Sequence, residues 1–149
     1  MIVHFCLKSQ IAELTRLAEE ITRLGTEHHL PEEVIFHLNL SLEEVVSNII
    51  RHGYGERDDG EVSLAIHLAP EALVVIVDDD GVPFNPLDLP APNLTGPVEE
   101  REVGGLGVYL VRQLMDEVEY RNEQGRNILR LMKRITPRGP GTNAGKTSK

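Results

Sequence analysis

The 149-residue sequence has one cysteine, no tryptophan and few aromatic residues of any kind. A single cysteine cannot form an intrachain disulfide, so we expect a hydrophobic core to stabilise the fold and Cys6 to be a buried thiol in a reducing compartment. No apolar run approaches the roughly 20 residues that span a bilayer. The apolar stretch from Ile2 is interrupted by His4 and Lys8, so the pattern of a signal peptide is missing. The sequence therefore predicts a cytoplasmic protein without a membrane partner.

Positive charge is also scarce. The chain has 15 lysine and arginine residues against 24 aspartate and glutamate residues, a formal net charge of -9. Binding to a phosphate backbone depends on lysine and arginine, so this composition argues against a direct nucleic-acid partner. The length suits one domain, which we expect to span residues 1–136. Residues 137–149 are rich in proline, glycine and lysine, and we expect them to form a disordered tail.

Hydrophobic periodicity predicts that the chain begins with a strand and two helices. Residues 1–7 form a short strand, and apolar side chains at helical spacing over residues 11–24 indicate a helix that stops at Gly25. Pro31, followed by two glutamates, opens a second helix that should run to about His52. The apolar stripe of this helix is expected to contain Val34, Leu38, Leu42, Val45 and Ile49, widened by Phe36 and Leu40.

The second half of the sequence predicts two hairpins around a long loop and a helix. Five prolines in residues 82–103 forbid regular structure, and such a loop is usually a functional lid or a disordered segment. A helix should begin at Gly107. The expected strands are residues 62–68, 73–77, 118–121 and 128–135. This order of elements indicates an α+β fold with helices on one face of a mainly antiparallel sheet.

Three polar or glycine-rich segments follow one another in an order that suggests a nucleotide pocket. Glu44 and Asn48 stand four residues apart, so a carboxylate and a carboxamide share one helix face. Asp79 and Gly81 end a run of β-branched residues. Residues 104–107 then open a helix, whose free backbone N–H groups attract phosphate. Taken singly, these segments have plainer explanations as a solvated helix face, a polar turn and a flexible helix start.

Together these segments resemble the sequence boxes of the Bergerat-fold ATPase and kinase superfamily, in the run from Leu42 to Tyr54 and in residues 79–86 and 104–111. The Arg-His-Gly-Tyr ending of the first run is similar to that of the anti-sigma factor serine/threonine kinases of bacterial partner-switching systems, and the resemblance covers residues 5–135. It implies a two-layer α/β sandwich, with helices on one face of a mainly antiparallel, mixed sheet. Three ordered boxes are far more specific than a lone glycine motif.

The resemblance implies roles for the residues of the predicted helix. Asn48 would hold a Mg²⁺ ion that bridges the phosphates of ATP, in keeping with the preference of Mg²⁺ for oxygen ligands. Glu44 would be the catalytic carboxylate, which accepts a proton from the attacking hydroxyl. Glu43 fits this role less well because it lies about 100° around the helix from Glu44. His52 matches a position close to the phosphates.

The resemblance also implies an adenine-binding group. Asp79 would accept a hydrogen bond from the exocyclic amine of the base, and the Asp-x-Gly spacing selects it over Asp78 and Asp80. Gly81 would let the base approach the backbone. Asn127 stands where many superfamily members have a threonine near the adenine, and its side chain can still form hydrogen bonds there.

The phosphate contacts are implied in the same way. Arg101, in the long loop, is a candidate to reach the γ-phosphate, although a basic residue in an exposed charge run more often stays solvated. The second glycine box would hold the phosphates through its backbone N–H groups; it comprises Gly104, Gly105, Leu106 and Gly107.

The function that the resemblance implies is that of a serine/threonine kinase that uses ATP and Mg²⁺. It would phosphorylate an anti-anti-sigma-like antagonist and sequester a sigma factor or another target, and the family tends to form homodimers. A nucleotide-gated binding module is the alternative from another class, but such a module would not need Glu44 as a base. A histidine-kinase-like catalytic domain would need a preceding helix pair with a phospho-accepting histidine. A helix-on-sheet interaction domain without nucleotide and a gyrase-type or chaperone-type ATPase are less favoured.

Overall fold

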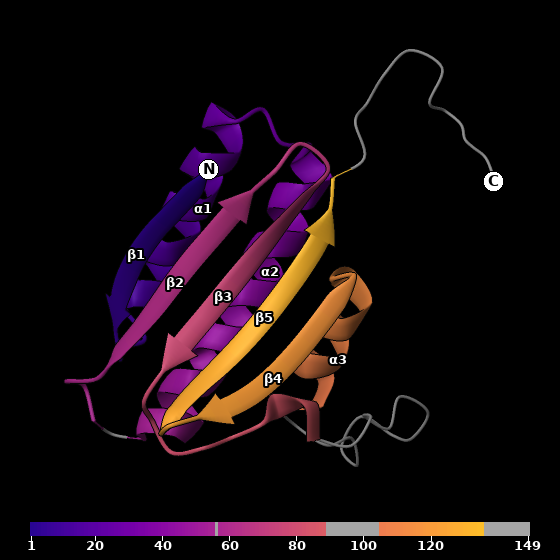
Figure 1. Ribbon diagram of the computed structural model, residues 1–149. Coiled ribbons are helices and arrows are strands. Elements are labelled where there is room, and N and C mark those ends of the chain that lie inside the picture. The colour runs from indigo at the N-terminus through magenta and orange to yellow at the C-terminus, as the bar shows by residue number, and fades with distance from the viewer. Residues whose placement is uncertain (56, 89–104, 136–149) are drawn as a thin grey trace, which may run out of the picture.

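The fold has two layers, a five-stranded sheet and a layer of helices packed on one of its faces (Figure 1). The structure is a computed structural model that describes residues 1–55, 57–88 and 105–135. The strand order is β1-β2-β3-β5-β4, and every pair of neighbouring strands is antiparallel. The α+β class and the two-layer sandwich predicted from the sequence are confirmed, whereas the sheet, expected to be mixed, is wholly antiparallel among the described strands.

The strands are β1 (Ile2–Lys8), β2 (Glu61–Leu68), β3 (Ala72–Asp79), β4 (Glu117–Glu123) and β5 (Arg126–Arg134). The helices are α1 (Glu13–Glu27), α2 (Glu32–Asn48) and α3 (Gly105–Leu114), with a π-helix, η1 (Ile49–Tyr54), directly after α2 and a short 3-10 turn, η2 (Pro86–Asp88). Among the described helices, none has the length and apolar character needed to cross a bilayer. The expected tail and most of the expected long loop lie outside the described residues.

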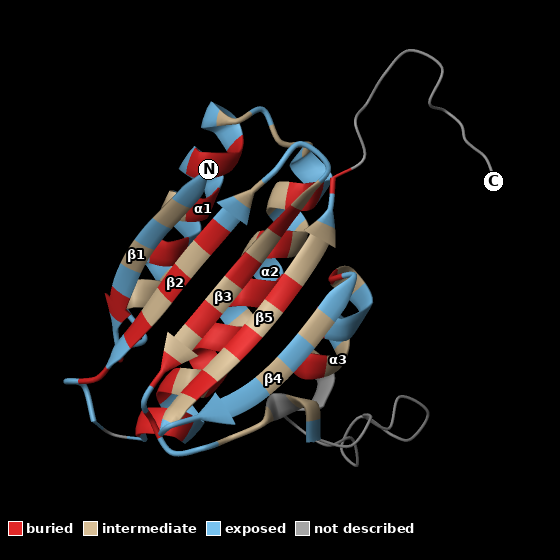
Figure 2. Cartoon of the chain, in the orientation of Figure 1, coloured by how far each residue is buried: buried red, intermediate tan, exposed pale blue. Residues whose placement is uncertain are grey.

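The hydrophobic core lies between the sheet and the helices. Strands with one face on a core alternate buried and less buried residues, and β3 follows this rule with buried Leu73, Val75 and Val77. Leu38 and Leu42 of α2 are fully buried against this face. Burial of each such side chain contributes roughly 1.5 to 3 kcal/mol. Figure 2 shows the buried residues concentrated in the central strands and in the helices behind them.

The ends of the first two helices differ from the sequence prediction. α1 does not stop at Gly25 but runs to Glu27, and the chain turns at His29, whose φ is 54°. A Cβ atom on Gly25 would overlap the side chain of Ile35, so this glycine permits close packing of α1 on α2. The second α-helix does not continue to His52, because the chain changes to a π-helix after Asn48.

Three predicted core side chains are in fact exposed. Phe36 and Leu40 are 62% and 37% exposed, so the apolar stripe of α2 is narrower than the sequence indicates. Cys6 is also exposed, with its Sγ 3.6 Å from Ser63 Oγ, so the prediction of a buried thiol is wrong. The physical reason is that β1 lies at the sheet edge and Cys6 belongs to the face of β1 that points away from the helices.

Candidate nucleotide-binding site

One end of the site is built where β3 and β5 stop. Asp79 is the last residue of β3, is only 2% exposed, and pairs with Asn127 in the sheet register. Its Oδ1 accepts hydrogen bonds from the Gly81 N–H at 2.8 Å and from Asn127 Nδ2 at 3.0 Å. Asp79 Oδ2 has no hydrogen bond to any of the described residues. Asp79 Oδ2 can therefore accept a hydrogen bond from a ligand.

The electrostatics of Asp79 follow from its burial. Burial penalises the charged form and raises the pKa of the Asp79 carboxyl above its ordinary value, an effect opposed by the hydrogen bonds from Asn127 and Gly81. The neighbouring carboxylates of Asp78 and Asp80 raise the pKa a little further. A buried carboxyl with a shifted pKa in a pocket is typical of a functional group.

Asn127 is held in one orientation by four hydrogen bonds. Its Nδ2 donates to Asp79 Oδ1 and, at 3.1 Å, to the Gly81 carbonyl oxygen. Its Oδ1 accepts from the Tyr120 hydroxyl at 2.5 Å and from Asn122 Nδ2 at 3.0 Å. All the hydrogen-bonding capacity of this carboxamide is thus used within the protein. Asn127 therefore orients Asp79. Its partners Tyr120 and Asn122 could not be predicted from the sequence, because those contacts depend on strand register.

Backbone contacts join the segment that follows Asp79 to η1. The Gly53 carbonyl oxygen accepts a hydrogen bond from the Val82 N–H at 2.7 Å. The backbone of Gly81 packs on that of Gly53, and a Cβ atom on Gly81 would lie 2.6 Å from the Gly53 carbonyl oxygen. Gly81 is required here because no side chain fits between the two backbones.

Tyr54 adds a second attachment for the same segment. Its hydroxyl lies 2.8 Å from both the Glu61 carbonyl oxygen and Asp80 Oδ1, and it accepts the Asp80 N–H at 3.1 Å. Burial, together with the hydrogen bond to Asp80, raises the pKa of Tyr54 to about 12. This tyrosine links the end of η1 to both the start of β2 and the segment after β3.

The other end of the site lies on the last turn of α2. Asn48 is 5% exposed, and its Nδ2 donates to Glu44 Oε2 at 3.0 Å. Arg51 Nη2 lies 3.5 Å from Asn48 Oδ1 and 3.3 Å from Ser47 Oγ. Glu44 is half-buried, whereas Glu43 is exposed. The structure therefore brings together the carboxylate and the carboxamide that share a helix face.

The start of α3 lies against Glu44. A Cβ atom on Gly107 would overlap the Glu44 carboxylate, so the absence of a side chain at Gly107 leaves that space to the carboxylate. Gly105 and Leu106 belong to the first turn of α3. Gly104 and Arg101 lie outside the described residues.

His52 lies beside Phe84, in the segment that follows β3. It is exposed, and its ring lies 5.0 Å from that of Phe84, centroid to centroid. Phe84 follows β3 and lies within the sequence box of residues 79–86, but it was not among the predicted site residues. The pair joins η1 to the segment that leads into the long loop.

The oxygens of Asn48 and Glu44 fit a magnesium–nucleotide complex. Within the described residues, no group of three or more histidine, cysteine or acidic side chains could hold a metal ion by itself. Mg²⁺ commonly binds through one or two protein oxygens together with phosphates and water. The donor set at the end of α2 therefore suits a metal that arrives with a nucleotide.

A small cavity of about 20 Å³ connects the two ends of the site. Such a volume holds roughly one water molecule, so a purine requires the lining to open, and Phe84 is the lining residue outside the regular elements. The cavity is lined by Val45, Asn48, Ile49, Asp79, Phe84, Tyr120, Asn127 and Leu129.

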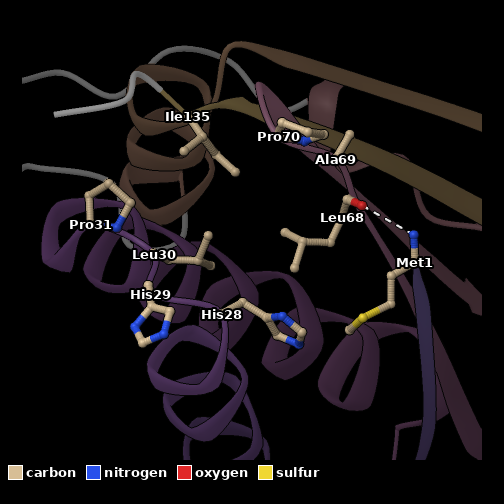
Figure 3. Close-up of a pocket in the computed structure, with 9 residues that line it drawn as sticks. All are labelled: Met1, His28, His29, Leu30, Pro31, Leu68, Ala69, Pro70 and Ile135. Atoms are coloured by element: carbon tan, nitrogen blue, oxygen red, sulfur yellow. Dashed lines mark hydrogen bonds between the residues drawn. The ribbon is translucent and has the colours of Figure 1, made fainter. Parts of the chain in front are cut away.

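A wider cavity, of about 560 Å³, lies at another end of the fold (Figure 3). Leu30, Leu68 and Ile135 border it, together with His28 and His29 from the α1–α2 connection. None of the predicted site residues lines this cavity. Chemistry rather than size thus identifies the small cavity as the candidate site.

Comparison with known proteins agrees with this geometry. The family model for the histidine kinase-like ATPase domain matches residues 7–133. A serine-protein kinase RsbW of Bacillus mycoides is 32% identical over 96 residues, which are 62% of this chain and 59% of that protein. An RsbW of Bacillus cereus is 31% identical over the same shares. The chain thus spans 59% of the length of the curated relatives it matches.

Solved structures show the same fold. A crystal structure of the RsbU and RsbW domains of a Mycobacterium tuberculosis protein superposes with a TM-score of 0.66 at 18% identity, over 91% of this chain and 32% of that one. The histidine kinase domain of a blue-light activated kinase from Erythrobacter litoralis gives a TM-score of 0.50 at 22% identity, over 84% of this chain and 60% of that one. The resemblance to the anti-sigma factor serine kinases is confirmed, and the chain belongs to the histidine kinase-like ATPase domain family.

Proposed function

We propose that this protein is an ATP-dependent serine/threonine kinase of the anti-sigma type. The observation that carries the proposal is that one pocket has a hydrogen-bond acceptor for a base at one end and oxygen ligands for a metal at the other. A buried Asp79 with a free carboxylate oxygen lies at one end, and the hydrogen-bonded pair Glu44 and Asn48 lies at the other. A nucleotide matches both ends. Its base offers a hydrogen-bond donor for Asp79, and its charged phosphate chain carries the metal toward Asn48.

The base would be read at the strand ends. Asp79 Oδ2 would accept a hydrogen bond from the exocyclic amine of adenine, because Asp79 Oδ1 is already engaged by Gly81 and Asn127. The packing of Gly81 on Gly53 leaves this part of the pocket without a side chain between the two backbones. A guanine carries a carbonyl oxygen where adenine has its amine, so it would face the carboxylate with an acceptor. The site should therefore prefer adenine nucleotides.

The phosphates would lie between α2 and the start of α3. Asn48 Oδ1 would be the protein ligand of Mg²⁺, which supplies neutralisation of the phosphate charge. The first N–H groups of α3, from Gly105 to Gly107, are free of intrahelical partners and suit phosphate oxygens. Asp79 and Asn48 would thus fix the two ends of the nucleotide.

The transfer step would depend on Glu44. Its carboxylate would accept the proton of a serine or threonine hydroxyl as the hydroxyl oxygen attacks the γ-phosphorus and the bond to the leaving ADP breaks. Because Gly107 has no side chain, the Glu44 carboxylate can occupy the space beside the start of α3. The hydrogen bond from Asn48 Nδ2 orients Glu44 beside the metal position.

The physiological substrate would be an anti-anti-sigma-like antagonist, and the unphosphorylated antagonist would compete with a sequestered sigma factor or other target. Support comes from the similarity to proteins named serine-protein kinase RsbW. The alternative is a nucleotide-gated binding module. It is favoured by one observation, that Glu44 is tied to Asn48 and could serve to orient that ligand alone.

The first experiment is a calorimetric titration of ATP with Mg²⁺ into the wild-type protein, Asn48→Ala and Glu43→Ala. We expect Asn48→Ala to weaken magnesium-dependent binding by at least about tenfold, and Glu43→Ala to bind as the wild type does because Glu43 is exposed. Absence of nucleotide binding by the wild type would refute the proposal.

The second experiment separates the two functions. Phosphotransfer to candidate antagonist domains is measured for the wild type, Glu44→Gln and Glu43→Gln. Glutamine at position 44 can still accept the Asn48 hydrogen bond but cannot act as a base, so binding should persist while transfer falls about 10²-fold to 10⁴-fold. ATP binding without transfer by the wild type would favour the nucleotide-gated module.

A further inference from the structure

A stripe of polar side chains runs along α2 and ends at the candidate site. With about 100° of rotation per residue, five side chains of this helix fall within about 80° of arc and so share one face. They are Glu33, His37, Ser41, Glu44 and Asn48. Glu44 and Asn48 belong to the candidate site, and the stripe continues from them toward the start of α2 through Ser41 and His37.

The stripe lies on the side of α2 that meets α3. The two helices pack beside each other on the same face of the sheet (Figure 1). A Cβ atom on Gly107 would overlap the Glu44 carboxylate, which places the start of α3 against the stripe. The opposite side of α2 meets α1, since Asn39 Nδ2 donates a hydrogen bond to Thr22 Oγ1 at 3.2 Å. The stripe is therefore part of the α2–α3 interface.

Ser41 has a buried hydroxyl for which the described chain provides no partner. The residue is 0% exposed, and its Oγ forms no hydrogen bond with residues 1–55, 57–88 or 105–135. A serine inside a helix ordinarily points to solvent or donates to the carbonyl oxygen four residues earlier. Ser41 does neither. Because an unpaired buried hydroxyl is unfavourable, this group calls for a partner from outside the polypeptide.

His37 has the same feature one turn earlier. Its Nδ1 is buried and has no hydrogen-bond partner in the described part of the chain, while Nε2 lies 3.9 Å from Glu33 Oε1. A neutral imidazole with its proton on Nε2, toward Glu33, presents Nδ1 as an acceptor. A hydroxyl donor on Ser41 and an imidazole acceptor on His37 thus lie on neighbouring turns of one helix face.

We propose that a water molecule is bound between α2 and α3 and bridges Ser41, His37 and Glu44. Buried waters typically make about three hydrogen bonds to polar groups that have no other partner. Donors and acceptors balance here, because the water would accept from the Ser41 hydroxyl and donate to His37 Nδ1 and to Glu44 Oε1. Glu44 Oε2 accepts from Asn48 Nδ2, whereas Oε1 accepts no hydrogen bond from the described residues.

Helix geometry brings the three groups within reach of one water molecule. Residues three or four positions apart have Cβ atoms about 5 to 6 Å from each other. Two hydrogen bonds of about 2.8 Å through one water span a similar separation. Long side chains in a helix also lean toward its N-terminus, so the Glu44 side chain extends over the turn that contains Ser41.

The bridging water would give the proposed catalytic carboxylate a second support. This consequence rests on the proposed kinase function, in which Glu44 accepts the proton of the substrate hydroxyl. Asn48 holds one oxygen of Glu44, and the water would hold the other, so the carboxylate would keep one orientation. Ser41 and His37 would be positioning residues, since each acts on the reaction through Glu44.

The water site is tested without nucleotide. A high-resolution crystal structure of the wild-type chain should show a water within hydrogen-bond distance of Ser41 Oγ and His37 Nδ1. Ser41→Ala should lower the melting temperature, because the water loses a partner. If the hydroxyl were simply unpaired, Ser41→Ala would instead be as stable as the wild type or more stable. That result, or a crystal structure without the water, would overturn the site.

Phosphotransfer tests the positioning role. Ser41→Ala and His37→Phe should each lower the transfer rate at saturating ATP about tenfold, because a catalytic group is displaced. The ATP dissociation constant should stay unchanged in both. His37→Asn should keep part of the rate, since its carboxamide can present an acceptor near the position of Nδ1. In the double variant the two losses should not add, because each removes the same water.

Asn39→Ala is the matched control on α2. It removes a hydrogen bond to Thr22 on the α1 side, so it should lower the melting temperature and leave transfer unchanged. Circular dichroism checks that each variant is folded. Full transfer by Ser41→Ala, or an equal loss in Asn39→Ala, would overturn the positioning role. A wild type that binds ATP but transfers nothing would overturn the kinase function and the positioning role together, while the crystal structure and the melting temperatures would still decide the water site.

Discussion

Asn127 donates a hydrogen bond to the Oδ1 of Asp79, its direct partner in the sheet register, and so fixes which oxygen of that carboxylate has no partner in the described part of the chain. The two residues come from different strands, and each is about 5% exposed or less. The side chain that we propose to bind the base is thus oriented by one that is itself fully hydrogen-bonded. This arrangement holds the Asp79 carboxylate in one geometry.

Asp79→Asn should separate binding from stability. Asparagine would present an N–H group where Asp79 offers Oδ2, so ADP affinity should fall about 10-fold to 100-fold at neutral pH. In the wild type, affinity should also fall as the pH drops through the raised pKa of Asp79, because the carboxyl is then protonated. Calorimetric titrations between about pH 4 and pH 8 test both points. Unchanged affinity in Asp79→Asn would contradict the assignment of Asp79 to the base.

The stability of the same variant should move the other way. A folded-state pKa that is raised means that the stability contributed by Asp79 is present at low pH and is lost as the pH rises through the folded pKa. Asparagine removes this loss, so Asp79→Asn should unfold at the same or a higher temperature than the wild type at neutral pH. A marked fall in melting temperature at neutral pH would show that the charge of Asp79 is stabilising.

Tyr54→Phe should loosen the attachment of the segment after β3. The change removes the hydroxyl that bonds to Glu61 and Asp80, and the free energy of unfolding should fall by about 1 to 2 kcal/mol. The pKa of Tyr54 is raised from 10.0 to about 12, so the wild type should lose stability as the pH rises through that window. Denaturant titrations on both sides of the window should show a smaller loss in the variant. If the wild type and Tyr54→Phe lost the same stability across this pH window, the ionisation responsible would belong to a group other than Tyr54.

Gly81→Ala and Gly53→Ala form a matched pair at one backbone contact. A Cβ atom on Gly81 would lie 2.6 Å from the Gly53 carbonyl oxygen, whereas a Cβ atom on Gly53 would find its nearest neighbour at 3.7 Å. Gly81→Ala should therefore destabilise the fold by about 1 to 3 kcal/mol and weaken nucleotide binding, while Gly53→Ala should be tolerated. Urea denaturation measures both. The reverse order of effects would mean that the two backbones do not approach in this way.

Gly107→Ala should affect transfer more than binding. Its methyl group would displace the Glu44 carboxylate, and Gly107 lies on the partly exposed start of α3, so the fold should remain stable. We expect phosphotransfer to fall at least about tenfold, since small displacements of a catalytic group are costly. Circular dichroism and calorimetry serve as controls. A loss of binding as large as the loss of transfer would indicate that Gly107 acts through the phosphates instead.

Much of the fold was predictable because its signals are local. The apolar periodicity of α2 and the alternation of β3 identified the elements, and the four-residue spacing of Glu44 and Asn48 put both on one helix face. Exposure was less predictable. Periodicity shows which residues share a face, but not whether another element covers it, and this is why Phe36 was wrongly placed in the core.

Parts of the site depend on tertiary structure and left no signal in the sequence. The contacts of Tyr120 and Asn122 with Asn127 are set by the register between β4 and β5. The change from α-helix to π-helix after Asn48 also has no composition that distinguishes it from a continuing α-helix. Such single π-helical turns occur often at functional sites.

The π-helical turn η1 links the proposed binding residues for the two ends of a nucleotide. η1 runs without interruption from the residue after Asn48 to Gly53 and Tyr54, which hold the segment beside Asp79. Asn48, which we propose to hold the metal, and the residues that hold the segment after Asp79 therefore lie on one short length of backbone. Substitutions at Asn48 and Tyr54 should then fail to add in a double-mutant cycle of nucleotide affinity, because a shift of this backbone moves both positions at once.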